Sequence, residues 1–293
     1  MKLLVFGFGY SAQYVAERLR GTGAEIAATV RTPAKAELLM QNGIRARVFS
    51  PDHRDHAIAQ DIAESKAILV SIPPQLSGDP VLAAFAETIA ATPKLRWIGY
   101  LSTVGVYGDH GGGWVDEATP VAPREGRSRI RAEAEQAWLA FGAGHGKAVQ
   151  IFRLAGIYGP GRNQLGQLAA GTARRIVKPG QVFNRIHVAD IAAVIEASLK
   201  HPRAGAIYNV TDDEPAPPQD VVSFAASLCG VPPPPEIAFE KAELTAMGRS
   251  FYGENKRVRN RLIRSELGVV LRYPSYREGL TALRADGEGP VAR

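Results

Sequence analysis

The chain has 293 residues, of which 45% are hydrophobic and 22% are charged, and its formal net charge is +6. This composition is ordinary for a globular protein, and the length suffices for one large α/β domain or for two lobes. The single cysteine, Cys229, excludes an internal disulfide framework and any cysteine-rich metal site, so we expect no metal. The positive charge favours an anionic ligand, but no aromatic-interleaved basic motif accompanies it, so we expect no nucleic acid as a partner.

The same sequence gives no reason to expect a membrane protein. No apolar stretch approaches the roughly twenty residues that a membrane span requires. Met1 and Lys2 lead directly into an apolar run, so we expect no signal peptide and a cytoplasmic location.

The first predicted element is a strand from Leu3 to Phe6, a short apolar run suited to burial on both faces. From Ser11 to Leu19 the apolar residues recur with the period of a helix. A helix that begins directly after a glycine turn leaves N–H groups and the positive end of its dipole free for an anion. This stretch therefore predicts an anion site at the start of the chain.

The turn itself has the spacing Gly-x-Gly-x-x-Ala, a small-residue variant of the dinucleotide fingerprint. Its residues are Gly7, Phe8, Gly9, Tyr10, Ser11 and Ala12. We predict that they bind the pyrophosphate of a dinucleotide. The alternative is a glycine turn that only lets the helix pack closely on the sheet.

The end of the second predicted strand, Ile26 to Val30, bears on which cofactor is bound. NAD sites usually place an acidic residue about twenty residues beyond the glycines. Here the following residues run from Arg31 to Lys35 without a carboxylate. Because Arg31 and Lys35 can pair with a 2′-phosphate, we predict NADP, with NAD less favoured. The alternative for Arg31 is a solvated side chain at the start of a loop.

Strands and helices continue to alternate along the chain, which is typical of a parallel sheet. We predict a Rossmann-type α/β fold, with a doubly wound parallel sheet of about seven strands between Leu3 and Val210. Such sheets bind ligands beyond the carboxyl ends of their strands. The predicted strands 67–72 and 97–101 therefore offer pocket residues at their ends, namely Ser71, Ile72, Pro73, Ser102 and Thr103.

Four motifs then follow in order along the chain: Ser102-Thr103-Val-Gly-Val106-Tyr107-Gly108, Glu117-Ala-Thr-Pro120, Arg153-Leu-Ala-Gly156-Ile-Tyr158-Gly159-Pro160-Gly161 and Arg185-Ile-His187-Val188-Ala-Asp190. Together they resemble the motifs of the extended short-chain dehydrogenase/reductase family, the NAD(P)-dependent nucleotide-sugar epimerases and dehydratases. The resemblance implies a small-molecule substrate of the nucleotide-sugar type or another polar carbonyl compound, and it is compatible with a homodimer. It also implies that Thr103 orients the substrate, and it makes Gly156 a further candidate for cofactor contact.

The order of the motifs predicts two lobes. The dinucleotide-binding Rossmann domain would comprise residues 1–158 and 186–211, and a smaller substrate lobe would comprise residues 159–185 and 212–293. The latter range includes a basic cluster from Lys256 to Arg264, for which a solvated face and a diphosphate contact are both open.

The family's catalytic motif is altered in this chain. The resemblance implies a Tyr-x-x-x-Lys pair within a run Tyr-Gly-x-Ser-Lys-x-x-x-Glu. The chain has Glu125-Gly126-Arg127-Ser128-Arg129-Ile-Arg-Ala-Glu133, which places Glu125 at the tyrosine position and Arg129 at the lysine position. A glutamate is deprotonated at neutral pH unless burial raises its pKa, and an arginine keeps its proton. The alternative is an ordinary solvent-facing ion pair.

The proton donor is therefore open at this point. Tyr107 and Tyr158 are alternative phenols near the strand ends, although either can serve packing alone, and His187 is expected to be structural. Two hypotheses about function follow. One is an NADP-dependent epimerase/dehydratase or oxidoreductase in which Glu125, Arg129 or another residue supplies the proton chemistry. The other is a non-catalytic NADP-binding sensor or scaffold, because fold alone does not fix function.

Overall fold

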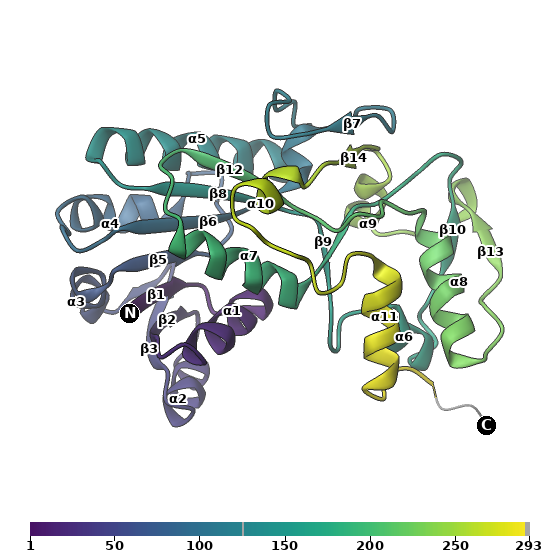
Figure 1. Cartoon of the computed structure of the whole chain (residues 1–293), viewed down its shortest axis with the longest axis horizontal. Coiled ribbons are helices and arrows are strands. Elements are labelled where there is room, and N and C mark those ends of the chain that lie inside the picture. Colours follow the sequence, from purple (N-terminus) through teal and green to yellow (C-terminus); the bar gives the residue numbers. More distant parts are fainter. Residues whose placement is uncertain (125, 291–293) are drawn as a thin grey trace.

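A large sheet forms the centre of the computed structural model, which describes residues 1–124 and 126–290 (Figure 1). Its eight strands follow the order β12-β8-β6-β5-β1-β2-β3-β4. Their bounds are β1 (Lys2–Phe6), β2 (Glu25–Val30), β3 (Arg45–Ser50), β4 (His53–Arg54), β5 (Ala67–Val70), β6 (Trp97–Thr103), β8 (Val149–Leu154) and β12 (Ala206–Val210). All pairings are parallel except that of the two-residue β4 with β3. The predicted parallel sheet between Leu3 and Val210 is confirmed.

Helices cover both faces of this sheet, as a doubly wound fold requires (Figure 1). One face packs against α1 (Tyr10–Arg20), α2 (Pro33–Gln41) and α7 (Val188–Lys200). The other packs against α3 (Ala57–Glu64), α4 (Pro80–Ala90) and α5 (Arg127–His145). Within β1, Leu3 and Val5 belong to the first core and Leu4 and Phe6 to the second, because successive strand residues point to opposite faces.

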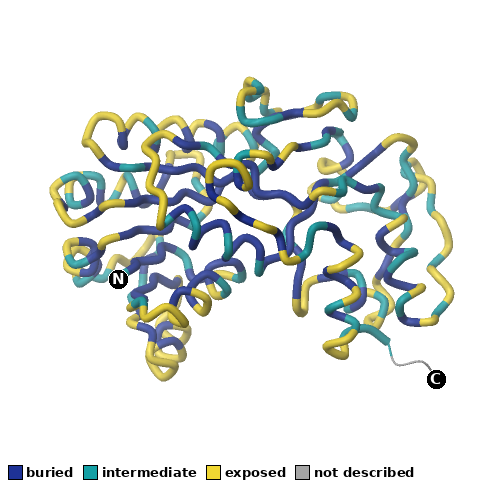
Figure 2. Tube along the Cα trace, in the orientation of Figure 1, coloured by how far each residue is buried: buried dark blue, intermediate teal, exposed yellow. Residues whose placement is uncertain are grey.

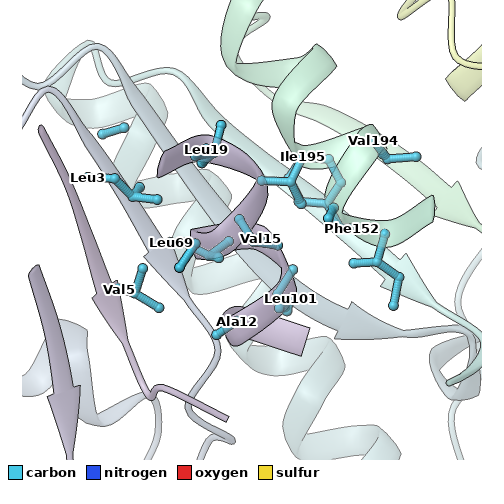
Figure 3. Close-up of a cluster of buried hydrophobic side chains, with 14 of the residues drawn as sticks. Leu3, Val5, Ala12, Val15, Leu19, Leu69, Leu101, Phe152, Val194 and Ile195 are labelled. Atoms are coloured by element: carbon cyan, nitrogen blue, oxygen red, sulfur yellow. The ribbon is translucent and has the colours of Figure 1, made fainter. Parts of the chain in front are cut away.

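The first of these cores fixes the position of α1. Ala12, Val15 and Leu19 point from α1 onto the sheet, beside Val194 and Ile195 of α7 (Figure 3). Figure 2 shows the same layering as a buried interior beneath exposed outer helix faces. Because the buried side of α1 is held along its length, its first turn has a fixed place at the carboxyl end of β1.

A second group of elements forms a smaller lobe, at the right of Figure 1. Its helices are α6 (Gln164–Ala169), α8 (Pro218–Cys229), α9 (Ala246–Phe251) and α11 (Tyr276–Ala285), and β10 (Arg175–Val177) pairs with β13 (Glu236–Ala238). The lobe has a separate core that includes Leu165, Val221 and Leu280. Two short strand pairs complete the fold: β9 (Gly156–Tyr158) with β11 (Arg185–His187), and β7 (Trp114–Val115) with β14 (Arg257–Val258).

The predicted range of the smaller lobe needs one correction. Residues 212–293 were all expected there, but α10 (Arg261–Ser265) and the segment after it pack on the large sheet. Ile263, Leu267 and Leu271 are buried in the core shared with α1 and α7. Helix α10 contacts β12, the last strand at this edge of the sheet. In the described residues, no helix combines the length and apolar character needed to cross a bilayer.

Candidate functional site

The glycine turn after β1 is held by its neighbours on both sides. Gly7 has φ +89°, and an added Cβ would lie 2.8 Å from Ile72 Cγ1. Its N–H donates to Thr29 Oγ1 at 3.0 Å, and the Phe8 N–H donates to the Thr29 carbonyl at 3.0 Å. Only glycine fits position 7, because the backbone is left-handed there and Ser71 and Ile72, just after β5, leave no room for a side chain.

Gly9 differs from Gly7, because nothing in the fold requires a glycine at that position. Its φ of −94° suits any residue, and an added Cβ would meet no atom within 4 Å. Gly9 is the N-cap of α1 and supplies no side-chain cap to the first turn. The first N–H groups of α1 therefore face open space beside a position without a side chain, which is the cradle that a pyrophosphate needs.

That open space is part of a cavity of about 970 Å³ along the carboxyl ends of β1, β2, β3 and β5. Of the predicted cofactor residues, this pocket is lined by Gly7, Phe8, Gly9, Arg31, Lys35, Ser71, Ile72 and Pro73. Residues that are far apart in sequence thus share one cavity. These residues suit a dinucleotide, because the N-terminus of α1 lies in one part of the pocket and two cationic side chains, Arg31 and Lys35, line another.

The cationic end consists of Arg31 and Lys35, which have different surroundings. Arg31 is exposed, and within residues 1–124 and 126–290 it forms no ion pair. Lys35 Nζ donates to the Phe8 carbonyl at 2.9 Å, so this side chain ties α2 to the glycine turn. Arg31 can therefore turn its whole guanidinium toward a phosphate. Lys35 has two of its three N–H donors left to bind the same group.

One wall of the pocket was not predicted. It comprises residues 49–54, from the end of β3 through β4, and the first part of α4, with Pro80, Ala83 and Ala84. Arg54 anchors this wall through a 2.9 Å hydrogen bond from Nη1 to the Ala84 carbonyl. The two-residue β4 carries no periodic signal, although Pro51-Asp52 could have indicated a turn there.

Three other predicted cofactor residues lie outside the pocket lining. Ser11 and Ala12 are buried beneath the first turn of α1. The Tyr10 hydroxyl donates to the Pro160 carbonyl at 3.0 Å, away from the cavity. Their contribution to a bound dinucleotide is therefore limited to the backbone of that turn.

Ser102 and Gly156 also have other partners than predicted. Ser102 is buried and its hydroxyl donates to Glu135 Oε1, so its side chain points into the interior under α5. Gly156 pairs with β11, and its N–H donates to the Asn184 carbonyl at 3.0 Å. Neither lines the cavity, and for Ser102 the reason is the buried carboxylate that competes for its hydroxyl.

The two phenols proposed as alternative acids are tied inside the protein. The Tyr107 hydroxyl donates to Asn209 Oδ1 at 2.8 Å, and the side chain is fully buried against the Arg153 guanidinium. The Tyr158 hydroxyl donates to the Ser275 carbonyl at 3.2 Å. Burial raises the pKa of both phenols above the ordinary value. The structure therefore gives Tyr107 and Tyr158 packing roles, and the prediction of Tyr107 as a catalytic residue is not supported.

Thr103 remains at the end of β6, partly exposed. Its Oγ1 accepts the Gly105 N–H at 3.1 Å and so caps the 3₁₀ helix Val104–Tyr107. The hydroxyl hydrogen stays available, because Oγ1 acts as an acceptor in this bond.

Helix α5 places Arg129 on its solvent-facing side, as the alternative to a catalytic role expects. Arg129 pairs with Glu133 at 3.6 Å on the outer face, where both side chains are more than half exposed. The inward positions are held by Arg131 and Glu135. Arg131 Nη1 donates to the Leu101 carbonyl at 3.0 Å and to the Tyr100 hydroxyl at 3.2 Å. Arg129 therefore does not reach the pocket, and Glu125 lies outside the described residues.

The basic cluster from Lys256 to Arg264 is largely occupied by internal partners. Lys256 is buried and donates to the Gly108 carbonyl at 2.6 Å and to Glu254. Arg259 lies over the Trp114 ring at 4.8 Å, and Arg264 pairs with Asp213. These contacts tie β14 and α10 to the rest of the fold, while Arg259, Arg261 and Arg264 remain exposed, which agrees with the predicted solvated face. Across the part of the chain that the structure describes, no group of three His, Cys, Asp or Glu residues is placed to hold a metal ion.

Comparisons with known proteins agree with this geometry. The model of the NAD dependent epimerase/dehydratase family matches residues 81–211. A structure described as a functionally unknown conserved protein from Silicibacter pomeroyi DSS is 50% identical, with a TM-score of 0.88 over 98% of this chain and 99% of that chain. Protein YeeZ of Escherichia coli K12 is 28% identical over 286 residues, covering 93% of this chain and 96% of YeeZ.

A more distant solved structure shares the fold. The human epimerase family protein SDR39U1, solved with NADPH, is 16% identical, with a TM-score of 0.74 over 98% of this chain and all of that chain. At this identity the likeness concerns the fold alone.

Proposed function

We propose that this chain, whose residues 81–211 match the model of the NAD dependent epimerase/dehydratase family, binds NADP in the pocket beside Gly9. Its ligand would be a small polar carbonyl compound of the nucleotide-sugar type. The observation that carries the proposal is the unfilled position at Gly9, where an added Cβ would meet nothing although the N-terminus of α1 begins there. No contact with the described residues requires a glycine at position 9, whereas a pyrophosphate bound at this turn would require one.

The chain's own groups would share the work of holding the cofactor. The N–H groups of the first turn of α1 would bind the pyrophosphate, helped by the helix dipole. Arg31 would pair with the 2′-phosphate, and the remaining donors of Lys35 would add to it. When bound, the nicotinamide ring supplies hydride transfer, and Thr103 at the end of β6 would orient a substrate hydroxyl or carbonyl.

The proton chemistry separates the two hypotheses about function. As an enzyme, the protein would need a proton donor or acceptor other than Tyr107 and Tyr158, whose hydroxyls are bonded inside. Glu125 stays a candidate base from the sequence alone. The second hypothesis is a cofactor-bound sensor, and the observation that favours it is the same internal bonding of the phenols.

The cofactor proposal is tested by comparing two glycine variants. Gly9→Val fills the space beside the N-terminus of α1, and Gly144→Val places the same side chain at another open glycine, on the exposed face of α5. We expect Gly9→Val to raise the dissociation constant for NADP, measured by fluorescence titration, at least about tenfold. Gly144→Val should bind as the native protein does, and both should unfold cooperatively near the native temperature. Unchanged affinity in Gly9→Val would remove the site from this turn.

Turnover distinguishes an enzyme from a sensor. Native protein loaded with NADP is incubated with a panel of nucleotide sugars, and products are separated by chromatography so that epimerisation without net redox change is seen. A product whose formation falls in Glu125→Gln supports the recruited-base hypothesis. A compound that raises the unfolding temperature without being converted supports the sensor.

A further inference from the structure

We propose that the segment after α11, residues 286–290, is a strap that positions Tyr10 and with it the first turn of α1 for the cofactor. Glu288 is the positioning residue of this strap. The proposal rests on the cofactor site beside Gly9. It concerns the other side of the same turn, where the protein holds the α1 N-terminus from behind.

The loop that contacts Tyr10 comprises residues 159–163. The Tyr10 hydroxyl donates to the Pro160 carbonyl at 3.0 Å, and the Arg162 guanidinium lies over its ring at 5.7 Å. An added Cβ on Gly159 would lie 2.7 Å from the Tyr10 hydroxyl. The loop therefore fits closely around this one side chain, which belongs to the first residue of α1.

Glu288 in turn holds this loop with both carboxylate oxygens. Oε1 accepts the Gly161 N–H at 2.9 Å, and Oε2 accepts from Asn163 Nδ2 at 2.6 Å. Asn163 is buried; its Nδ2 also donates to the Gly159 carbonyl at 2.9 Å, and its Oδ1 caps α6 through the Gly166 N–H. One carboxylate thus holds the middle and the last residue of the loop.

The strap itself is anchored, so Glu288 cannot follow a movement of the loop. Its N–H donates to the Leu283 carbonyl at 3.0 Å, and its carbonyl accepts from Arg284 Nη1 at 3.0 Å. The next residue, Gly289, packs against Cys229, and an added Cβ there would lie 2.9 Å from Sγ. A chain of contacts therefore runs from the smaller lobe through Glu288, the loop and Tyr10 to the dinucleotide turn.

A positioning role and a purely electrostatic role of Glu288 predict opposite effects of Glu288→Gln on the affinity for NADP. A carboxylate near an anion site opposes binding of the cofactor phosphates, so removing its charge would tighten binding if it acted only through its field. A positioning role predicts the reverse, because the N–H donors of α1 lose their fixed place. In Glu288→Gln only one acceptor oxygen remains, so the bond to either the Gly161 N–H or Asn163 Nδ2 is lost while the size of the side chain is kept.

The test measures the dissociation constant for NADP in the full-length protein by titration. We expect Glu288→Gln and Tyr10→Phe each to weaken binding about 3- to 10-fold, and the double variant to be no weaker than the worse single one, because both break one path. Hydrogen exchange of the cofactor-free protein should rise at residues 159–163 and 10–13 in Glu288→Gln. The control is Glu214→Gln, which removes an exposed carboxylate paired with Arg277 elsewhere on the smaller lobe and should change neither readout.

Three outcomes overturn the proposal. Unchanged or tighter NADP binding in Glu288→Gln, while Gly9→Val abolishes binding, refutes the strap and leaves the cofactor site in place. Additive losses in the double variant would show that Glu288 and Tyr10 act separately. If Gly9→Val also binds NADP normally, the cofactor site itself is wrong and the strap has nothing to position.

Discussion

Glu135 and Arg153 form an ion pair in the interior, with Arg153 Nη2 2.8 Å from Glu135 Oε2 and both side chains about 5% exposed or less. The pair joins α5 to β8, and Glu135 also accepts the Ser102 hydroxyl from β6. If either partner of such a buried pair is removed, the charge of the other is left uncompensated in the interior, which destabilises the fold.

We therefore predict a large difference between two neighbouring glutamates. Glu135→Gln leaves the Arg153 charge uncompensated in the interior and should lower the free energy of unfolding by about 3–5 kcal/mol. Glu133→Gln, on the exposed face of the same helix, should change it by less than about 0.5 kcal/mol. Urea denaturation of both variants checks the prediction. Equal losses would mean that Glu135 is not the buried partner.

This pair also shows what the motif comparison left out. Glu133 and Glu135 lie on one helix, and the resemblance to the family run included Glu133 but gave Glu135 no role. The rotation of α5 is instead set by its apolar residues Ala134, Trp138 and Phe141, which are buried against the sheet. Glu135 lies three residues before Trp138 and so shares its face. The spacing of these apolar residues in the sequence indicates that Glu135 faces the sheet, but a comparison of motifs does not take that spacing into account.

Most of the sheet was predictable for a simple physical reason. Strands buried on both faces read as apolar runs, and β1 and β5 are such runs flanked by turns. The short β4 and the strap around Glu288 leave no such trace. Their places depend on contacts such as that of Gly161 with Glu288, 127 positions apart, which no local pattern encodes.

The predicted preference for NADP depends on Arg31. A charge-assisted pair with the 2′-phosphate contributes about 1.5–3 kcal/mol, which corresponds to a more than tenfold gain in affinity. Arg31→Ala should therefore narrow the ratio of the NAD and NADP dissociation constants by about that factor, chiefly by weakening NADP. The control is Arg96→Ala, an exposed arginine just before β6, which tests the effect of net charge alone. A native protein that binds NAD as tightly as NADP would contradict the assignment.

His187 gives the fold a dependence on pH. Burial, aided by the Arg272 charge, lowers its pKa from 6.5 to about 4, and its Nδ1 accepts the Ala189 N–H at 3.2 Å. Between these two values the unfolded chain binds a proton that the folded protein does not. Stability from this group is thus complete above pH 6.5 and is lost as the pH falls toward 4, by about 1–3 kcal/mol in total.

The measurement is the free energy of unfolding between pH 4 and 7. His187→Asn keeps a capping oxygen for α7 but removes the titrating ring, so its stability should fall less steeply with acid than that of the native protein. His56→Asn, at an exposed position before α3, should keep the native slope. A native slope in His187→Asn would assign the acid sensitivity to other groups.

The last prediction separates Arg129 from Arg131, two residues apart on α5. Among the described residues Arg129 pairs with Glu133 alone, on the exposed face, so Arg129→Ala should cost about 0.3–0.5 kcal/mol and leave the NADP dissociation constant unchanged. Arg131→Ala removes the guanidinium from the Leu101 carbonyl and leaves the buried Tyr100 hydroxyl without that donor. Bonds to a charged donor contribute about 1.5–3 kcal/mol, so this variant should unfold at clearly lower urea concentration.

Together the two variants test the rotation of α5 in solution. The outcome that supports the structure is a stability loss confined to Arg131→Ala, with NADP binding intact in Arg129→Ala. A tenfold weaker affinity in Arg129→Ala would show that Arg129 turns inward when the cofactor is bound. That result would restore Arg129 as a candidate for cofactor contact.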